Sequence, residues 1–139
     1  MEKYKIGYTM GVFDLFHIGH LNILKRAKEK CEYLIVGITT DELCFERKCK
    51  YPVIPFEERA EIVKSICYTN EIVPQTTMDK LNAWQQYKFN VIFVGDDWKG
   101  SSTWEQHEKD FSEVGVDVIY FPYTSHTSST LLTEVLKKL

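Results

Sequence analysis

Two histidines three positions apart are the residues of this 139-residue sequence whose type and spacing best suit chemistry. His17 and His20 end the segment GVFDLFHIGH, where a predicted strand gives way to a helix that is expected to begin near Ile18. On one helix face both imidazoles can reach the same phosphate, as neutral donors or as cations. The free N–H groups at a helix N-terminus favour an anion, and Gly11 permits close backbone approach. The spacing therefore predicts a phosphate-binding site.

The same histidine pair has simpler explanations. The rings can cap the helix, sit half-buried with their hydrogen bonds satisfied, or form part of a zinc site together with Asp14. Asp14 can also orient a histidine or hold another metal ion through the same turn. The strand-loop-helix context favours the phosphate-binding interpretation, because it places a helix N-terminus beside the pair.

A triplet of hydroxyl-bearing residues marks the start of another helix. Ser128, Ser129 and Thr130 open the last predicted helix and offer side-chain caps for it. Helix N-capping accounts for one of these hydroxyls and not for three in a row.

Alternating strand and helix patterns position these groups. Short runs rich in β-branched and aromatic residues predict five buried strands, at residues 5–9, 33–39, 71–74, 91–95 and 116–121. Helical patterns follow each of these strands. The alternation predicts one doubly wound, Rossmann-like α/β domain over residues 1–139, with a five-stranded parallel sheet in the order 3-2-1-4-5 and helices on both faces.

The predicted strand order also locates the ligand. Such sheets bind ligands beyond the carboxyl ends of their strands, at the point where the strand order reverses. Here that point lies between the first and fourth strands, beside residues 10–20 and 96–100, and residues 123–130 follow the fifth strand at the same edge. The histidines, the polar segment after the fourth strand and the hydroxyl triplet are therefore expected to meet.

Composition and charge exclude several classes of protein. A net charge of −3 gives no broad basic surface for nucleic acid or an anionic membrane. No apolar run approaches the roughly 18 residues that span a bilayer, and MEKYKIGYTM lacks a secretory signature, so a cytoplasmic location is expected. The four cysteines lack metal-binding spacing and are expected to be free thiols. Cys67 is expected to be buried within the helix predicted from EERAEIVKSICY.

Three segments resemble the motifs of the cytidylyltransferase branch of the HxGH nucleotidyltransferases, in the same order and spacing. GVFDLFHIGH resembles the signature G-x-F-D-x-x-H-x-G-H, and VGDDW at 94–98 and TSHTSST at 124–130 resemble the two later motifs. The likeness is greatest to bacterial glycerol-3-phosphate cytidylyltransferases, which consist of this domain, act with Mg²⁺ and are usually homodimers. The resemblance implies transfer of CMP from CTP to glycerol 3-phosphate, giving CDP-glycerol and pyrophosphate.

The resemblance also implies roles for individual residues. His20 would stabilise charge on the reacting α-phosphate, His17 would lie nearer the leaving pyrophosphate, and Asp14 would be catalytic and a weak metal ligand. Lys80 would meet the acceptor phosphate, whereas a lysine in the first turn of a helix is equally expected to face solvent. The residues implied in nucleotide binding are Val12, Phe13, His17, His20, Lys50, Asp97, Tyr123, Thr124, Thr127, Ser128, Ser129 and Thr130.

The loop after the second strand reads FERKCKYPVIPFEER and corresponds to the place of the family's catalytic lysines. Lys50 is predicted to be catalytic and to bind the nucleotide, and Lys48 to bind the acceptor, with Arg47 as a rival because the loop is one residue longer than usual. A mobile basic loop of this kind closes over its substrates as a lid. The alternative is a merely solvated charged loop. Asp41, directly after the second strand, is a weaker nucleotide-binding candidate.

Two residues depart from the family pattern and leave the acceptor open. Tyr123 and Cys67 stand where arginines are usual, and a protonated His126 can replace one missing charge. Other acceptors are phosphoethanolamine, phosphocholine, a polyol phosphate or a phosphonate. An aromatic cage for choline is conceivable from Trp84, Trp98, Trp104 and Tyr123. Adenylyl transfer and a non-catalytic nucleotide-binding module are the remaining alternatives.

Overall fold

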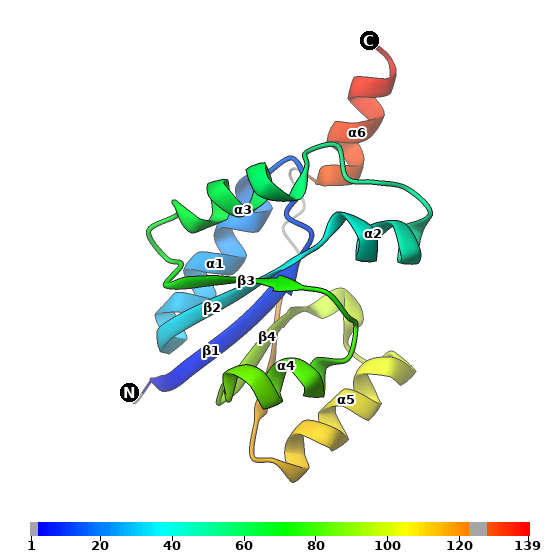
Figure 1. The fold of residues 1–139 in the computed structure, drawn as a ribbon. Coiled ribbons are helices and arrows are strands. Elements are labelled where there is room, and N and C mark those ends of the chain that lie inside the picture. The colour runs from blue at the N-terminus through cyan, green and yellow to red at the C-terminus, as the bar shows by residue number, and fades with distance from the viewer. Residues whose placement is uncertain (1–2, 123–127) are drawn as a thin grey trace.

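Five parallel strands form one sheet in the order β3-β2-β1-β4-β5 (Figure 1). This computed structural model describes residues 3–122 and 128–139. The strands are β1 (Tyr4–Gly11), β2 (Cys31–Thr39), β3 (Glu71–Gln75), β4 (Val91–Gly95) and β5 (Asp117–Phe121). The predicted fold class and strand order are confirmed, and every predicted strand is present with ends shifted by three residues or fewer.

Helices cover both faces of the sheet, as predicted (Figure 1). They are α1 (Ile18–Lys30), α2 (Asp41–Lys48), α3 (Phe56–Lys64), α4 (Lys80–Tyr87), α5 (Ser102–Glu113) and α6 (Ser129–Lys137), with a short 3-10 turn η1 (Asp96–Trp98). Leu34 and Val36 of β2 pack with α1 and α3 in one apolar cluster. Tyr8 and Ile92 pack with α4 and α5 in a second cluster on the opposite face. The two clusters hold the strand ends, and therefore the ligand edge, in fixed positions.

Two local expectations from the sequence are wrong. The start of the basic segment is helical rather than looped, because α2 runs to Lys48 with Thr40 as its N-cap and ends at Cys49 in the left-handed conformation. Cys67 is exposed rather than buried. The helix before it ends at Lys64, and Ser65 donates its hydroxyl to the carbonyl of Glu61. Ile66, not Cys67, then packs on the core.

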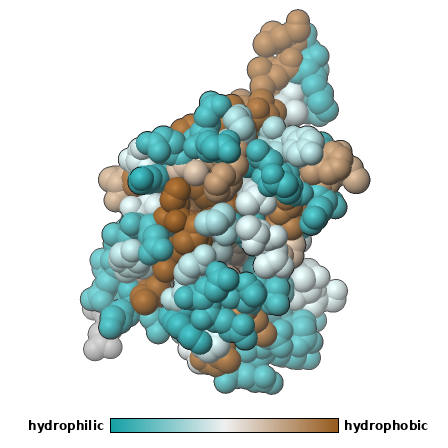
Figure 2. Space-filling view, viewed as in Figure 1, coloured by the Kyte–Doolittle hydropathy of each residue, from teal (hydrophilic) through white to brown (hydrophobic). Residues whose placement is uncertain are grey.

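The last helix projects from the body of the domain beside the ligand edge (Figure 1). Its N-terminus is tied to the domain, whereas Leu131, Val135 and Leu136 are about half exposed. Apolar side chains accordingly lie on the projecting end in the space-filling view (Figure 2). Among the helices described, none has the length and apolar character needed to cross a bilayer.

Candidate active site

The turn between β1 and α1 is held in an uncommon backbone conformation. Phe13 and Leu15 have φ angles of 55° and 51°, in the left-handed region that costs a non-glycine residue about 1–2 kcal/mol. Phe13 is buried, and its ring contacts Phe16 and His20 with centroid separations of 6.4 and 5.3 Å. A Cβ atom at Gly11 would lie 3.2 Å from the Phe13 ring. Packing therefore fixes a strained turn that places the start of α1 at the ligand edge.

The two histidines cap α1 reciprocally. His17 is the N-cap, and its Nδ1 accepts the backbone N–H of Gly19 at 3.0 Å. In return, Nδ1 of His20 accepts the N–H of His17 at 3.3 Å, and the rings stack with centroids 3.9 Å apart. Because each Nδ1 is an acceptor, each neutral ring carries its proton on Nε2. The capping interpretation is therefore correct, and it leaves both Nε2–H groups available as donors.

Burial keeps these rings uncharged. Desolvation lowers the pKa of His17. Desolvation, followed by the nearby ring of His17, lowers the pKa of His20 to about 3. The sequence left open whether the pair acts as neutral donors or as cations. In the structure without ligand both rings are neutral at pH 7, so they offer hydrogen bonds rather than charge.

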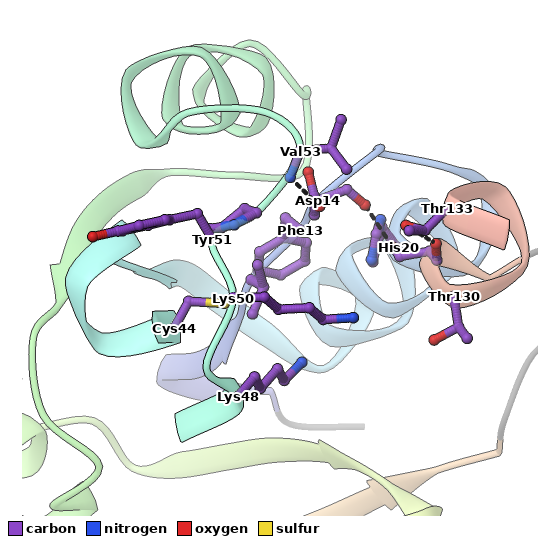
Figure 3. Close-up of a pocket in the computed structure, with 13 residues that line it drawn as sticks. Phe13, Asp14, His20, Cys44, Lys48, Lys50, Tyr51, Val53, Thr130 and Thr133 are labelled. Atoms are coloured by element: carbon purple, nitrogen blue, oxygen red, sulfur yellow. Dashed lines mark hydrogen bonds between the residues drawn. The ribbon is translucent and has the colours of Figure 1, made fainter. Parts of the chain in front are cut away.

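Asp14 joins the turn to two segments that are distant in sequence (Figure 3). Its carboxylate accepts the backbone N–H groups of Val53 at 2.8 Å and Ile54 at 2.9 Å. Its carbonyl oxygen accepts the hydroxyl of Ser129, at the start of α6. Asp14 therefore holds the basic segment and the last helix against the turn. Its catalytic and metal-binding roles stay predictions.

Arg59 is a central residue that the sequence reasoning missed. The residue is 1% exposed, and its side chain donates to the carbonyl oxygens of Ile54, Val12 and Thr39 at 2.6–2.9 Å. It also pairs with the carboxylate of Asp41 at 2.6 Å. Asp41 thus anchors the ends of β1 and β2 through Arg59. The signal in the sequence was an arginine four positions before Val63, on the buried face of a predicted helix.

A cleft of about 290 Å³ opens above this turn (Figure 3). Val12, Phe13 and His20 line one side, and the start of α6 lines another. Lys48 and Lys50 extend their side chains into the space that His20 and Thr130 face (Figure 3). Two ammonium groups, the imidazole of His20 and a helix N-terminus therefore surround one cleft, an arrangement suited to a polyphosphate. His17 stacks on His20 but is not among the residues that line either cleft.

The three hydroxyl groups at the start of α6, of Ser128, Ser129 and Thr130, have different partners. Ser128 is the N-cap and accepts the N–H of Leu131 at 3.0 Å. Ser129 donates to Asp14, so its hydroxyl hydrogen is already in use. Thr130 lines the cleft, and its hydroxyl hydrogen-bonds to none of the residues described. The first N–H groups of α6 also lack partners within the helix. Thr130 and these N–H groups are the available phosphate donors.

A second cleft of about 350 Å³ adjoins the first. It lies between the ends of β1 and β4 and the helices α4 and α5. Lys80 forms part of its wall and is 4% exposed. This lysine makes no ion pair or hydrogen bond with the part of the chain that the structure describes. Desolvation and then the charge of Arg47 lower its pKa to about 8. The alternative of a solvent-facing Lys80 is wrong, and an unpaired buried cation indicates an anionic ligand.

Several predicted residues are not placed by the structure. Tyr123, Thr124, His126 and Thr127 lie outside the described residues, and the side chain of Asp97 is not described. Arg47 lines the second cleft and Lys48 lines both.

Cys67 lies near neither cleft. It belongs to the turn between α3 and β3, and it is absent from both sets of lining residues. Trp98, in contrast, is 44% exposed and lines the second cleft. Cys67 therefore removes no charge from the two clefts described.

The described part of the chain contains no cluster of three or more histidine, cysteine or acidic side chains that can hold a metal ion. The zinc-site explanation of the histidines therefore lacks ligands in that part. The Mg²⁺ expected from the resemblance would have to take most of its ligands from phosphate oxygens and water, which Mg²⁺ commonly does.

Comparison with known proteins gives consistent matches over most of the chain. A family model described as cytidylyltransferase-like matches residues 8–135. The chain is 36% identical over 132 residues to a glycerol-3-phosphate cytidylyltransferase of Bacillus spizizenii, covering 94% of this chain and 96% of that protein. It is 31% identical over 130 residues to an FAD synthase of Pyrococcus abyssi, covering 93% of this chain and 88% of that protein.

A solved structure shares the fold. The lipopolysaccharide core biosynthesis protein of Thermoplasma volcanium superposes with a TM-score of 0.73 and 19% identity, covering 89% of this chain and 99% of that one. At this identity the likeness concerns the fold alone.

Proposed function

Because the chain belongs to the cytidylyltransferase-like family, we propose that it transfers CMP from CTP to glycerol 3-phosphate, releasing pyrophosphate and forming CDP-glycerol. Family membership confirms the resemblance predicted from GVFDLFHIGH and the two later motifs. Relatives of nearly the same length carry the name of this activity. The chain is therefore an enzyme of the nucleotidyltransferase class rather than a binding module.

One observation supports this reaction most strongly. Val12, Phe13, His20 and Lys48 line both clefts, so the two clefts meet at the start of α1. A triphosphate held in the first cleft and a phosphorylated acceptor held in the second would face each other there. Nucleotidyl transfer requires this arrangement, because the acceptor oxygen must approach the α-phosphorus opposite the leaving pyrophosphate.

The proposed chemistry needs no general base. The acceptor is a phosphate monoester with a second pKa near ~6, so it is mostly dianionic at neutral pH. One of its oxygens forms a bond to the α-phosphorus of CTP while the bond from that phosphorus to the bridging oxygen breaks. Both electrons of the broken bond leave with pyrophosphate, and no proton is transferred.

The residues in the first cleft, together with His17 beside it, act by positioning and by electrostatic stabilisation. The Nε2–H groups of His17 and His20 donate to phosphate oxygens as charge moves toward the pyrophosphate. Lys50 and the N-terminus of α6 supply positive potential on the other side of the triphosphate. Mg²⁺ bound to the triphosphate would neutralise further charge. The strained turn keeps these donors in place before substrate binds.

Lys80 is suited to hold the acceptor phosphate in the second cleft. Its pKa of about 8 leaves it mostly protonated at pH 7, and the cleft provides no carboxylate partner among its described lining residues. Arg47 lines the same cleft. Together with Lys48, which lines both clefts, these cations bind a dianion and orient its oxygen toward the first cleft.

We also propose that the protein is a homodimer, as the resemblance implies. The exposed apolar residues Leu131, Val135 and Leu136 on α6 support this proposal, because such side chains gain stability when another surface covers them. Light scattering of the wild-type protein and of Val135→Asp measures the mass directly. A monomeric wild-type protein contradicts the proposal.

A panel assay tests the reaction. Pyrophosphate release is measured with CTP or ATP against glycerol 3-phosphate, ethanolamine phosphate, phosphocholine, polyol phosphates and phosphonates. The proposal predicts CTP-dependent release with glycerol 3-phosphate. The relatives named FAD synthase make ATP the critical comparison, and activity with ATP alone refutes cytidylyl transfer.

A further inference from the structure

The part of the second cleft that α5 lines contains polar groups that the reaction itself does not use. His107 and Thr103 both lie on α5 and line this cleft. They are four positions apart, so their side chains share one helix face. Neither side chain hydrogen-bonds to any residue within 3–122 or 128–139. The cleft therefore presents an imidazole and a hydroxyl to whatever it binds.

Packing holds the imidazole of His107 in place. Its ring contacts Trp104 edge-on at a centroid distance of 4.8 Å, and Phe111 lies 6.4 Å away on the same helix. Desolvation is the largest cause that lowers its pKa, and the charge of Lys80 adds to it, while Asp110 and Asp79 act in the opposite direction. A neutral imidazole offers one donor and one acceptor, which is what a hydroxyl group requires.

The charges around the cleft discriminate between acceptors. Arg47, Lys48 and Lys80 line it, and its described lining residues include neither aspartate nor glutamate. Asp79 is nearby, but its carboxylate caps α4 by accepting the N–H groups of Leu81 and Asn82. Among the lining residues that the structure describes, an ammonium group on the acceptor would meet three cations and no carboxylate.

The aromatic rings do not compensate for that repulsion. Lys88 already covers the ring of Trp84, with 4.0 Å between its Nζ and the ring centroid. Trp104 is 4% exposed and packed edge-on by His107. Of the three tryptophans, Trp98 alone is left exposed on the cleft, and one ring among the described residues is not a cage.

We propose that His107 and Thr103 are specificity residues that hydrogen-bond the hydroxyl groups of the acceptor, and that they select a polyol phosphate over an amino-alcohol phosphate. Lys80 holds the phosphate of the acceptor, and the face of α5 contacts its uncharged end. The inference rests on the proposed function and deepens it by assigning residues to acceptor choice.

Steady-state kinetics at saturating CTP test the assignment. His107→Phe keeps an aromatic ring beside Trp104 and removes both nitrogens, and Thr103→Val keeps the shape and removes the hydroxyl. Lys109→Met, an exposed change on the same helix, is the control. Each test variant should raise KM for glycerol 3-phosphate about tenfold, the effect of one good hydrogen bond. The KM for CTP and the kcat should change less than about twofold.

Selectivity provides the second readout. The ratio of kcat/KM for glycerol 3-phosphate to that for ethanolamine phosphate should fall about tenfold in both variants and stay constant in the control. An unchanged KM for glycerol 3-phosphate overturns the inference, and so does an equal loss for both acceptors and CTP, which indicates a packing role. A wild-type protein that makes no CDP-glycerol instead refutes the proposed function.

Discussion

Replacement of the buried Lys80 should stabilise the protein while it weakens acceptor binding. Lys80 is 4% exposed and has no anionic partner among the described residues, and its pKa falls from 10.5 to about 8. Each factor of ten in proton affinity corresponds to about 1.4 kcal/mol. Holding the charged ammonium in the folded protein therefore costs about 3 kcal/mol at pH 7. Lys80→Met removes the charge and keeps a flexible side chain of similar length, so its free energy of unfolding should be higher by about that amount.

The pH dependence separates this cause from a gain in packing. Because the folded pKa lies below the unfolded pKa, the cost is fully present below pH 8 and is relieved as the pH rises through 8 toward 10.5. The increase in the free energy of unfolding that Lys80→Met gives over the wild type should therefore shrink from about 3 kcal/mol at pH 7 to about 1.5 kcal/mol near pH 9.5.

Urea unfolding followed by tryptophan fluorescence at the two pH values measures the difference. Lys109→Met is the matched control, because it removes an exposed lysine and should change stability by less than about 0.5 kcal/mol. Glycerol 3-phosphate should raise the stability of the wild-type protein and not that of Lys80→Met. The reasoning is refuted if Lys80→Met is no more stable than the wild type at pH 7, or if its advantage is independent of pH.

Three further predictions follow from the contacts around the clefts. Arg59→Met should lower the free energy of unfolding by about 3–5 kcal/mol in urea titrations, because it leaves the Asp41 carboxylate without its buried partner; a loss below 1 kcal/mol contradicts this. Ser129→Ala should raise KM for CTP about fivefold by releasing α6 from the carbonyl of Asp14, with KM for the acceptor unchanged; equal rises in both contradict it. The KM for the acceptor should rise as the pH passes about 8, where Lys80 loses its proton. The kcat/KM for the acceptor should fall below about pH 6 as the acceptor phosphate is protonated. Kinetic constants that do not change with pH contradict both expectations.

The sequence predicts the framework of this domain because its signals are local. Alternating strand and helix patterns give a parallel sheet with right-handed crossover connections. That topology brings the histidine turn and the start of α6 to the edge formed by the carboxyl ends of the strands. The strand ends and the helix N-termini follow directly from chain order. The site's location could therefore be predicted before its contacts were known.

The contacts that the sequence missed join segments distant along the chain. Arg59 pairs with Asp41 and donates to the carbonyl oxygens of Val12, Thr39 and Ile54, so no spacing rule reveals its role. The burial of Lys80 likewise depends on how α4 packs beside α5. Asp14 is hydrogen-bonded to residues 39, 40 and 115 positions away. Its place in the sequence, near two histidines, does not indicate these partners.

The histidines show that two interpretations of one motif need not exclude each other. The sequence presented helix capping and phosphate binding as alternatives for His17 and His20. The structure uses the Nδ1 atoms for capping, which fixes the Nε2–H groups as donors. Neither the tautomer nor the loss of charge on burial is visible in residue types, because both depend on the geometry of the turn.

The fate of the individual phosphates of CTP tests nucleotidyl transfer most directly. CTP labelled at the α-phosphorus or at the γ-phosphorus is incubated with glycerol 3-phosphate and the wild-type protein or His20→Ala. The α-label should appear in CDP-glycerol and the γ-label in pyrophosphate, and His20→Ala should slow both by at least about a hundredfold. Transfer of the γ-label to glycerol 3-phosphate, or full activity of His20→Ala, would contradict the account.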